Sequence, residues 1–375
     1  MPGRIVLYGA TGHTGGLTAR ALVASGARPV LAGRDRGRLE ALAGRLSREG
    51  ERLETAVVGS PEPGAGSLRE LIGPGDVLVS TAGPFLRIGR PAVEAAVEAG
   101  AIYLDSTGEP PFIRQVFQEL GPRAERTGAV LLTAFGYDYV PGNLAGALAL
   151  EAAGPAAMQV RVGYFVSGDL RKGASAGTRA SIAGMLFDPG YSLRGGRVVA
   201  ERTATHVASF EIDGRGRQAF SVGSSEHFAL PRLRREPPVT DVGVYLGWFG
   251  GASGLVRYAT QLAALAGRSR SVRGLVDQQA RRIQRSRAVP AGQALRSDVV
   301  AEAADAQGRR LVTVRLTGGD PYSFTARMLA WAASTAAAEG IRPAGALGPA
   351  EAFGVARLES ACAAAGFHRQ VPLPG

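Results

Sequence analysis

The residues nearest the N-terminus that could do chemistry are three glycines, spaced as Gly9-Ala-Thr-Gly12-His-Thr-Gly15. A short apolar run, RIVLYGA, leads into them, and an amphipathic stretch, GGLTARALVASG, follows. A glycine turn between a strand and a helix lets a pyrophosphate approach the backbone at the helix N-terminus, where free N–H groups favour negative charge. We therefore predict a dinucleotide-binding turn formed by Gly9, Ala10, Thr11, Gly12, His13, Thr14 and Gly15.

The end of the second expected strand indicates which dinucleotide is bound. NAD-binding domains usually carry Asp or Glu at this point, to accept hydrogen bonds from the ribose 2′-OH. Here the strand ends in Gly33-Arg34-Asp35-Arg36, and an arginine offers a planar fork for a 2′-phosphate. We predict NADP(H), with contacts from Gly33, Arg34, Asp35 and Arg36. Asp35 keeps NAD open as an alternative, and Arg36 and Arg38 are equally explained as solvent-exposed charges at the start of a helix.

A third segment, Ser80-Thr-Ala-Gly-Pro-Phe85, follows the fourth expected strand. Ligands of open α/β sheets bind at the carboxyl ends of such strands. We therefore expect Ala82, Gly83, Pro84 and Phe85 to flank the cofactor, although a simple turn caused by Gly-Pro is the alternative.

These motifs need a scaffold, and the first 140 residues alternate between strand and helix patterns. The near-continuous apolar strands predict a parallel sheet covered on both faces. The expected strands are 4–10, 28–34, 53–60, 75–83, 101–107 and 129–136, and the expected helices include 15–26, 35–49, 67–73, 89–100 and 111–128.

The pattern changes after about residue 150, where segments 158–168, 196–214 and 217–231 alternate with turn residues. This pattern predicts a largely antiparallel sheet. Helical patterns return at 253–267, 271–286 and 323–340, with a strand at 309–319. We predict an α/β fold: a doubly wound Rossmann domain at 1–140, an α+β substrate domain at 141–340, and a C-terminal helical segment at 341–375 that packs back on the first domain.

Composition excludes several mechanisms. Lys172 is the only lysine, and because it lies between Arg171 and Gly173 it cannot form a P-loop. A short-chain dehydrogenase dyad would need Tyr at position 168, which is a glycine. The single cysteine, Cys362, excludes an internal disulfide and a multi-cysteine zinc site, so no metal is expected. We expect a reduced, cytoplasmic protein without a membrane span, since the longest uncharged apolar stretch, 242–255, is shorter than the ~20 residues a spanning helix needs.

Together these residues resemble a known family. The motifs GATGHTG, STAGPF, YLDSTGE and FGYDYVPGN are similar to those of the saccharopine dehydrogenase-like oxidoreductases, which include the trans-acting enoyl reductases that serve polyketide synthases. The resemblance implies a nicotinamide cofactor and hydride transfer in a cleft between two domains. The sequence differs from the family at Pro141-Gly142-Asn143 and Ala176-Gly177-Thr178, which leaves the substrate class open.

Hydride transfer also needs a proton donor or electrostatic support for the second atom of the reduced bond. We place Tyr137, Asp138 and Lys172 in this catalytic role. Further candidates near the expected cleft are Tyr139, Asp105, Glu109, His206 and His227, although for the two histidines a surface or strand-face position is the favoured interpretation. For Asp138 the structural alternative is a turn residue that bonds its own backbone.

The net charge of +11 does not predict a nucleic-acid groove, because the basic residues are spread along the chain and the two basic clusters lack interleaved aromatics. The clusters are Arg232, Arg234 and Arg235, and Arg268, Arg270, Arg273, Arg281, Arg282, Arg285 and Arg287. They are either solvated faces or a docking surface for an acidic acyl carrier protein.

Function is expected to be NADPH-dependent reduction of a C=N or conjugated C=C bond in a biosynthetic intermediate. The substrate would be a small molecule, free or tethered to a carrier, and a homodimer is kept open. The alternative is a non-catalytic NADP(H)-binding sensor or scaffold.

Overall fold

The computed structural model describes residues 3–47, 52–59, 66–167, 189–247 and 295–370. Lys172, the helices expected at 253–286 and the basic cluster at 268–287 lie outside the described residues. The chain divides into two compact units. Unit 1 contains residues 1–107, 112–140 and 321–365, and unit 2 contains 108–111, 141–320 and 366–375.

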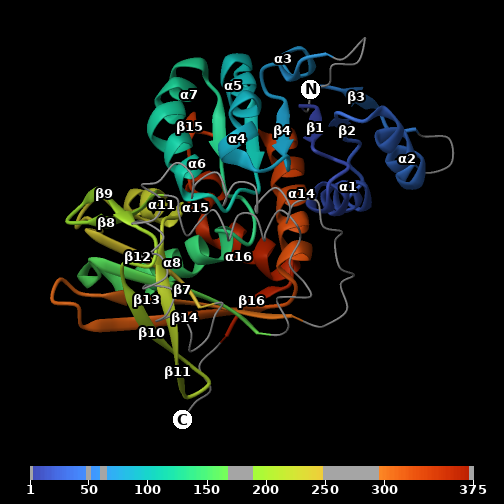
Figure 1. Ribbon diagram of the computed structural model, residues 1–375. Helices are drawn as coiled ribbons and strands as arrows, with labels where there is room; N and C mark the ends of the chain where they lie inside the picture. The colour runs from blue at the N-terminus through green and yellow to red at the C-terminus, as the bar shows by residue number, and fades with distance from the viewer. Residues whose placement is uncertain (1–2, 48–51, 60–65, 168–188, 248–294, 371–375) are drawn as a thin grey trace, which may run out of the picture. The chain divides into compact units, whose positions relative to one another are not determined.

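The sheet of unit 1 is parallel, as the apolar strands predicted. Its order is β15-β6-β5-β4-β1-β2-β3, so β4 and β1 are adjacent at the centre and the chain winds outward from them in both directions (Figure 1). In the central register Leu7 lies between Leu31 and Val79, all three fully buried. The strands are β1 (Ile5–Tyr8), β2 (Val30–Gly33), β3 (Thr55–Val57), β4 (Val77–Ser80), β5 (Ile102–Asp105), β6 (Val130–Leu132) and β15 (Gly345–Ala346).

The helices of unit 1 follow the predicted pattern, except that the short helix α4 (Phe85–Ile88) is not among the expected ones and one expected helix is divided. The helix expected over 111–128 is divided by a π-helical turn at Val116–Leu120, directly before Pro122, which lacks the N–H that a continuous helix needs. The helices are α1 (His13–Ala24), α2 (Arg36–Leu46), α3 (Leu68–Leu71), α4 (Phe85–Ile88), α5 (Arg90–Ala99), α6 (Pro110–Gln115), α7 (Gly121–Thr127), α14 (Pro321–Glu339), α15 (Pro349–Phe353) and α16 (Val355–Ala364).

Helix α14 corrects the domain boundary expected at residue 340. The expected boundaries put this helix in the second domain, but it belongs to unit 1. It lies along α1 and contacts β1, β4 and β5, burying Phe324, Met328 and Leu329 (Figure 1). The final segment is also shared between units, because β16 (Phe367–Arg369) pairs with β14 of unit 2 instead of packing on unit 1.

Unit 2 is built on the largely antiparallel sheet that the sequence predicted. Its main order is β10-β11-β12-β7-β13-β14-β16, with β8 and β9 attached through β12, and among the described pairings only β12 with β7 is parallel. The strands are β7 (Gln159–Ser167), β8 (Pro189–Arg194), β9 (Arg197–Arg202), β10 (Val207–Ile212), β11 (Arg215–Val222), β12 (Asp241–Leu246), β13 (Arg296–Ala304) and β14 (Arg310–Gly318). The described helices include α8 (Val140–Ala153) and α11 (Glu226–Ala229).

The β10–β11 hairpin covers part of one sheet face. β11 pairs with β12 only at Phe220–Val222, and the rest of the hairpin reaches beyond this pairing. Its Phe210 packs edge-on against Phe165 of β7, with ring centroids 5.7 Å apart. Gly163 makes room for this contact, because a Cβ there would lie 2.9 Å from the Phe210 ring. The hairpin thereby closes a small buried aromatic cluster of its own.

Candidate functional site

A cavity of about 840 Å³ lies at the carboxyl ends of β1, β2 and β4 in unit 1. These strands flank the point where the strand order reverses, which is where open α/β sheets bind ligands. The three sequence motifs all contribute to its walls. The lining includes Gly9, Thr11, Gly12, Gly33, Arg34, Arg38, Val58, Gly59, Ser67, Arg69, Thr81, Ala82, Gly83, Arg87, Ala92 and Ala95.

The glycine turn is shaped by close backbone approaches. Gly9 has φ +81°, and its N–H donates to the Ala32 carbonyl of β2 at 3.0 Å. The Thr81 hydroxyl donates to the carbonyls of Tyr8 and Gly9, at 3.1 and 3.2 Å, so the loop after β4 supports the turn. A Cβ on Gly15 would lie 2.2 Å from the Gly9 carbonyl oxygen, so only glycine lets α1 approach the strand so closely.

The N-terminus of α1 points its free N–H groups toward the turn. Gly12 is the N-cap residue and provides no side-chain hydrogen bond to the first turn of the helix. Gly12 is exposed and lines the cavity, whereas Gly15 is buried behind it. Uncapped N–H groups and the helix dipole make this a suitable position for a pyrophosphate.

Of the four cofactor contacts predicted at the end of β2, two line the cavity and two do not. Gly33 and Arg34 line the cavity, while Asp35 and Arg36 are not among its lining residues. Asp35 instead caps α2, because its Oδ1 accepts from the Arg38 N–H at 3.0 Å. Arg38 lines the cavity as well, and its Nη2 donates to the Thr11 carbonyl at 2.9 Å, which ties α2 to the glycine turn.

Of the four residues predicted to flank the cofactor after β4, two line the cavity and two do not. Ala82 and Gly83 line the cavity, whereas Pro84 caps α4 and Phe85 is buried against Phe112, with ring centroids 5.7 Å apart. Ser67 and Arg69 of the α3 region and Arg87 of α4 are lining residues that sequence reasoning missed. No local motif marks them, because only the sheet order brings α3 and α4 to the same cavity.

His13 lies outside the cavity lining. Its ring meets Tyr322 of α14 edge-on, with centroids 4.9 Å apart. Ala10 is fully buried beneath the turn, so of the predicted turn residues Gly9, Thr11 and Gly12 face the cavity.

The cavity suits an adenosine 2′-phosphate. The glycine turn and α1 N-terminus fit the pyrophosphate, Val58, Ala92 and Ala95 supply an apolar wall, and Arg34 and Arg38 supply two guanidinium groups at the end of β2. NADP(H) is thus compatible with the residues that form this part of the chain.

Asp105, a candidate from the motif YLDST, connects the ends of β5 and β6. Its carboxylate accepts from the Thr107 N–H and the Ala134 N–H, both at 2.9 Å, and from the Thr133 hydroxyl at 2.8 Å. Complete burial nevertheless raises the pKa of Asp105 to about 6, because desolvation outweighs these hydrogen bonds. These contacts are those of a structural residue.

Asp138 has a different environment. Its Oδ1 is fully buried and has no hydrogen-bond partner among the residues that the structure describes, so the turn residue bonded to its own backbone is not observed. Burial raises the pKa of Asp138 to about 7. The neighbouring Tyr137 is buried, and its N–H donates to the Thr325 hydroxyl of α14 at 2.9 Å. Tyr139 is also buried, with its N–H bonded to the Ala134 carbonyl.

The remaining candidates show structural surroundings. His206 lies 3.4 Å from Glu201 with 43% of its side chain exposed, as in a surface pair. His227 is buried against Tyr191, and burial lowers its pKa to about 4, so it is neutral. Glu109 is buried.

Of the first basic cluster, Arg234 is engaged within unit 2. It donates to the carbonyls of Gly154, Ala157 and Pro237, so it fastens the chain after α8 and is not a free surface charge. No group of three or more potential metal ligands occurs among the described residues. Within the same part of the chain, no helix is long and apolar enough to cross a membrane.

The sheet order, the glycine turn and the cavity define a dinucleotide-binding Rossmann unit. Residues 5–132 match the sequence model of the saccharopine dehydrogenase NADP binding domain. The predicted resemblance and the predicted nicotinamide cofactor are therefore confirmed for this part of the chain.

Curated relatives are similar over the same part. Over 142 residues the chain is 39% identical to the trans-acting enoyl reductase of Mycobacterium leprae and 37% identical to that of Mycobacterium ulcerans. The aligned stretch is 37% of this chain and 34% of each relative, so the match spans about a third of the relatives' length. Among solved structures, the amine dehydrogenase of Mycobacterium smegmatis aligns over 95% of both chains, at 13% identity and a TM-score of 0.45.

Proposed function

We propose that this protein is an NADPH-dependent reductase that transfers hydride to a conjugated C=C or a C=N bond of a biosynthetic intermediate. The cavity lined by the glycine turn, Arg34 and Arg38 is the observation that carries the proposal. The names of the relatives favour an enoyl thioester as acceptor, free or tethered to an acyl carrier protein. A cytoplasmic location and a homodimer belong to the same proposal.

Bound NADPH would supply the hydride to one atom of the double bond. The other atom then needs a proton, and we assign its delivery to Asp138. A carboxylic acid with a pKa of about 7 still carries its proton near neutral pH, and burial of Oδ1 keeps water from competing for it. Tyr137 is kept as the second candidate, and Lys172 lies outside the described residues.

Cofactor preference tests the arginine assignment. Replacing Arg34 or Arg38 with Ala removes a charged donor that would face the 2′-phosphate, so NADPH affinity should fall about 10- to 100-fold while NADH affinity changes little. Arg36→Ala is the matched control, because Arg36 starts the same helix but does not line the cavity. Fluorescence titration with both nucleotides measures the effect, and an unchanged preference in both variants would refute the assignment.

Turnover tests the reaction. NADPH oxidation is followed at its near-ultraviolet absorbance with a panel of enoyl thioesters and cyclic imines. Oxidation with either class supports a reductase and identifies the bond that is reduced. Tight NADPH binding without turnover across the panel would instead support the non-catalytic sensor.

The pH profile tests Asp138. The proposed donor works only when protonated, so the rate of reduction should fall as pH rises through about 7. Asp138→Asn should lower kcat about 100-fold or more and remove this limb of the profile, with NADPH binding retained as the control for folding. A variant with the wild-type profile would exclude Asp138 as the donor.

A further inference from the structure

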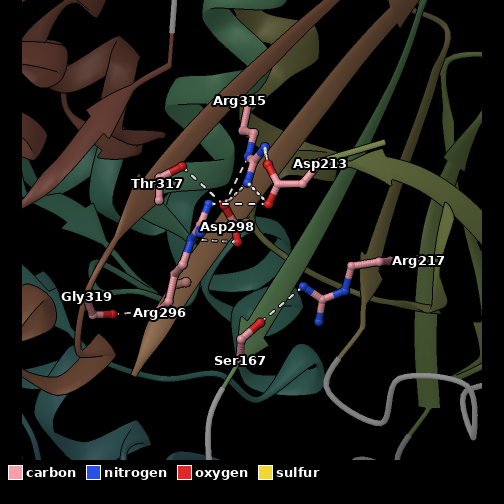
Figure 2. Close-up of polar contacts among 9 residues, drawn as sticks. Ser167, Asp213, Arg217, Arg296, Asp298, Arg315, Thr317 and Gly319 are labelled. Carbon is pink, nitrogen blue, oxygen red and sulfur yellow. Dashed lines mark hydrogen bonds and ion pairs between the residues drawn. The ribbon is translucent and has the colours of Figure 1, made fainter. Parts of the chain in front are cut away.

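Unit 2 carries an arginine–aspartate cluster that the proposed reaction does not use (Figure 2). We define the cluster as Arg217, Arg296, Arg315, Asp213 and Asp298. The arginines come from three strands, β11, β13 and β14, and Asp213 lies in the turn of the β10–β11 hairpin. Segments that are about 100 residues apart in sequence therefore bring three guanidinium groups to one place.

Asp298 is the buried carboxylate that holds the arginines of the cluster in place. Only 2% of its side chain is exposed, and its Oδ1 accepts from Arg315 Nε and Nη2 at 3.0 and 2.7 Å and from the Thr317 hydroxyl at 3.1 Å. Its Oδ2 lies 3.5 Å from Arg296 Nε. Because Asp298 is buried and contacts both side chains, it fixes the orientation of the Arg296 and Arg315 guanidinium groups.

Asp213 is the exposed member. With 62% of its side chain exposed, it accepts from Arg315 Nη1 and Nη2 at 2.6 and 3.2 Å, and it lies 3.6 Å from Arg296 Nη2. Figure 2 shows it reaching the arginines from the hairpin side, opposite Asp298. The two-point contact is the geometry with which arginine binds oxyanions.

Arg217 makes no direct contact with Asp213, but its charge acts with those of Arg315 and Arg296 to lower the pKa of the Asp213 carboxyl. Its Nη1 donates to the Ser167 hydroxyl at 3.2 Å, and its guanidinium lies 5.0 Å from the centre of the Phe165 ring. Arg296 faces Ser167 directly in the β7–β13 register. The Ser167 hydroxyl accepts from Arg217, while the Arg296 side chain is directed to the two carboxylates at 3.5–3.6 Å.

The charges within the cluster do not cancel. Three guanidinium groups face two carboxylates, and only Asp213 can leave without exposing a buried charge. An exposed ion pair contributes little to stability. A phosphate group brings more negative charge and more acceptor oxygens than a carboxylate, so it can compete for the same donors.

We propose that Arg217, Arg296 and Arg315 form a binding site for a phosphate ester, with the Asp213 carboxylate as an internal competitor that occupies it in the free protein. The site lies within unit 2 and shares no residue with the cavity of unit 1, so it goes beyond the proposed reaction. The phosphate belongs to a pantetheine arm or is free inorganic phosphate, and both present the same chemistry to the arginines.

Binding is measured calorimetrically on the full chain with three probes: pantetheine 4′-phosphate, inorganic phosphate, and pantetheine as the compound without phosphate. Each titration is repeated on Arg34→Ala, because Arg34 and Arg38 of the unit 1 cavity are themselves proposed to hold a phosphate group. The two phosphate probes should bind and pantetheine should not. Tighter binding of pantetheine 4′-phosphate supports the arm as the source, and equal binding supports free phosphate.

Substitutions within the cluster are expected to change the affinity for phosphate in opposite directions. Asp213→Asn removes the competitor and should tighten phosphate binding about fivefold, and asparagine tolerates the positive φ of this turn. Arg217→Gln and Arg296→Gln should each weaken binding about tenfold or more. Arg310→Gln is the matched control, because Arg310 lies on the same strand as Arg315 but pairs with Glu302.

Binding that persists in Arg34→Ala but is lost in Arg217→Gln and Arg296→Gln belongs to the unit 2 cluster, and binding that is lost only in Arg34→Ala belongs to the unit 1 cavity. Failure of the NADPH proposal and failure of this one are therefore distinguishable. The proposal is overturned if Asp213→Asn binds phosphate no more tightly than the natural chain. It is equally overturned if Arg217→Gln and Arg296→Gln bind as the natural chain does, or if pantetheine binds as well as its phosphate.

Discussion

Neighbouring residues of the same type have different tasks at the start of α1. The backbone contacts of Gly15 leave no room for a side chain, whereas a Cβ on Gly16 would lie 3.8 Å from the Ala10 carbonyl oxygen, an ordinary contact. Arg36 and Arg38 show a similar division at the start of α2, since only Arg38 lines the cavity and reaches the glycine turn. Residue type alone therefore does not determine which of two neighbours serves the cofactor.

Alanine substitution separates the two glycines. Gly15→Ala should lower the free energy of unfolding by about 3 kcal/mol, because the new methyl group meets a carbonyl oxygen. Gly16→Ala should raise it by about 0.5–1 kcal/mol, as expected for alanine in a helix interior. Urea denaturation of both variants measures the difference, and similar values would contradict the close packing described for Gly15.

The glycine positions were predictable because each answers a local requirement of a strand–turn–helix unit. The roles of Arg38 and Asp105 were not, since they depend on the distances from Arg38 to Thr11 and from Asp105 to Thr133, which only the folded sheet sets. The capping role of Asp35 has a local signal, because an Asp directly before a helical pattern is a common N-cap. The same residue type at the end of this strand also indicates NAD, so the signal is ambiguous.

Among the elements, the end of β5 is joined to the end of β6 through the Asp105 carboxylate. This connection holds the loops after both strands together beside the cavity-bearing edge of the sheet. Several elements that sequence reasoning missed, α8, β8, β12 and β13, lie in unit 2. Their patterns are short or uniformly apolar, and such runs do not distinguish strand from helix without the neighbours that pair with them.

The Asp105 connection should make stability depend on pH. Its pKa is about 6 in the folded chain against 3.8 when exposed, so the folded state holds the proton more tightly. This contribution is fully present below about pH 4 and is lost as pH rises through about 6, which amounts to about 3 kcal/mol. Asp105→Asn should therefore show a smaller loss of stability between pH 4 and pH 7 than the natural chain, measured by urea denaturation at both values. An equal loss in both proteins would place the pH dependence elsewhere.

For the whole molecule, the Rossmann unit is formed from both ends of the chain. About 180 residues of unit 2 separate Val140 from Pro321, yet α14 buries Phe324 and Met328 in unit 1 and β15 extends its sheet. No signal in the sequence marks this return, because the pattern at 323–340 is that of any buried helix. The domain expected at 1–140 is therefore incomplete.

Two shortened chains test this completeness. Residues 1–140 alone should not unfold cooperatively, because the side of the sheet that α14 covers would be exposed to water. The same residues joined to 321–365 by a flexible Gly/Ser linker should unfold cooperatively and bind NADPH. Near-ultraviolet circular dichroism and thermal denaturation distinguish the two chains, and a cooperative transition in residues 1–140 would show that α14 is dispensable.

The return of α14 also has a consequence for biosynthesis. At a translation rate of ~5–20 residues per second, β6 leaves the ribosome roughly 10–40 seconds before the helix α14 begins to emerge, and the earlier strands leave still sooner. During this interval the nascent Rossmann unit presents apolar surface that no part of the emerged chain can cover, while unit 2 is still being made. A ribosome-bound chaperone should therefore contact this protein from the emergence of β6 until residue 339 has left the exit tunnel.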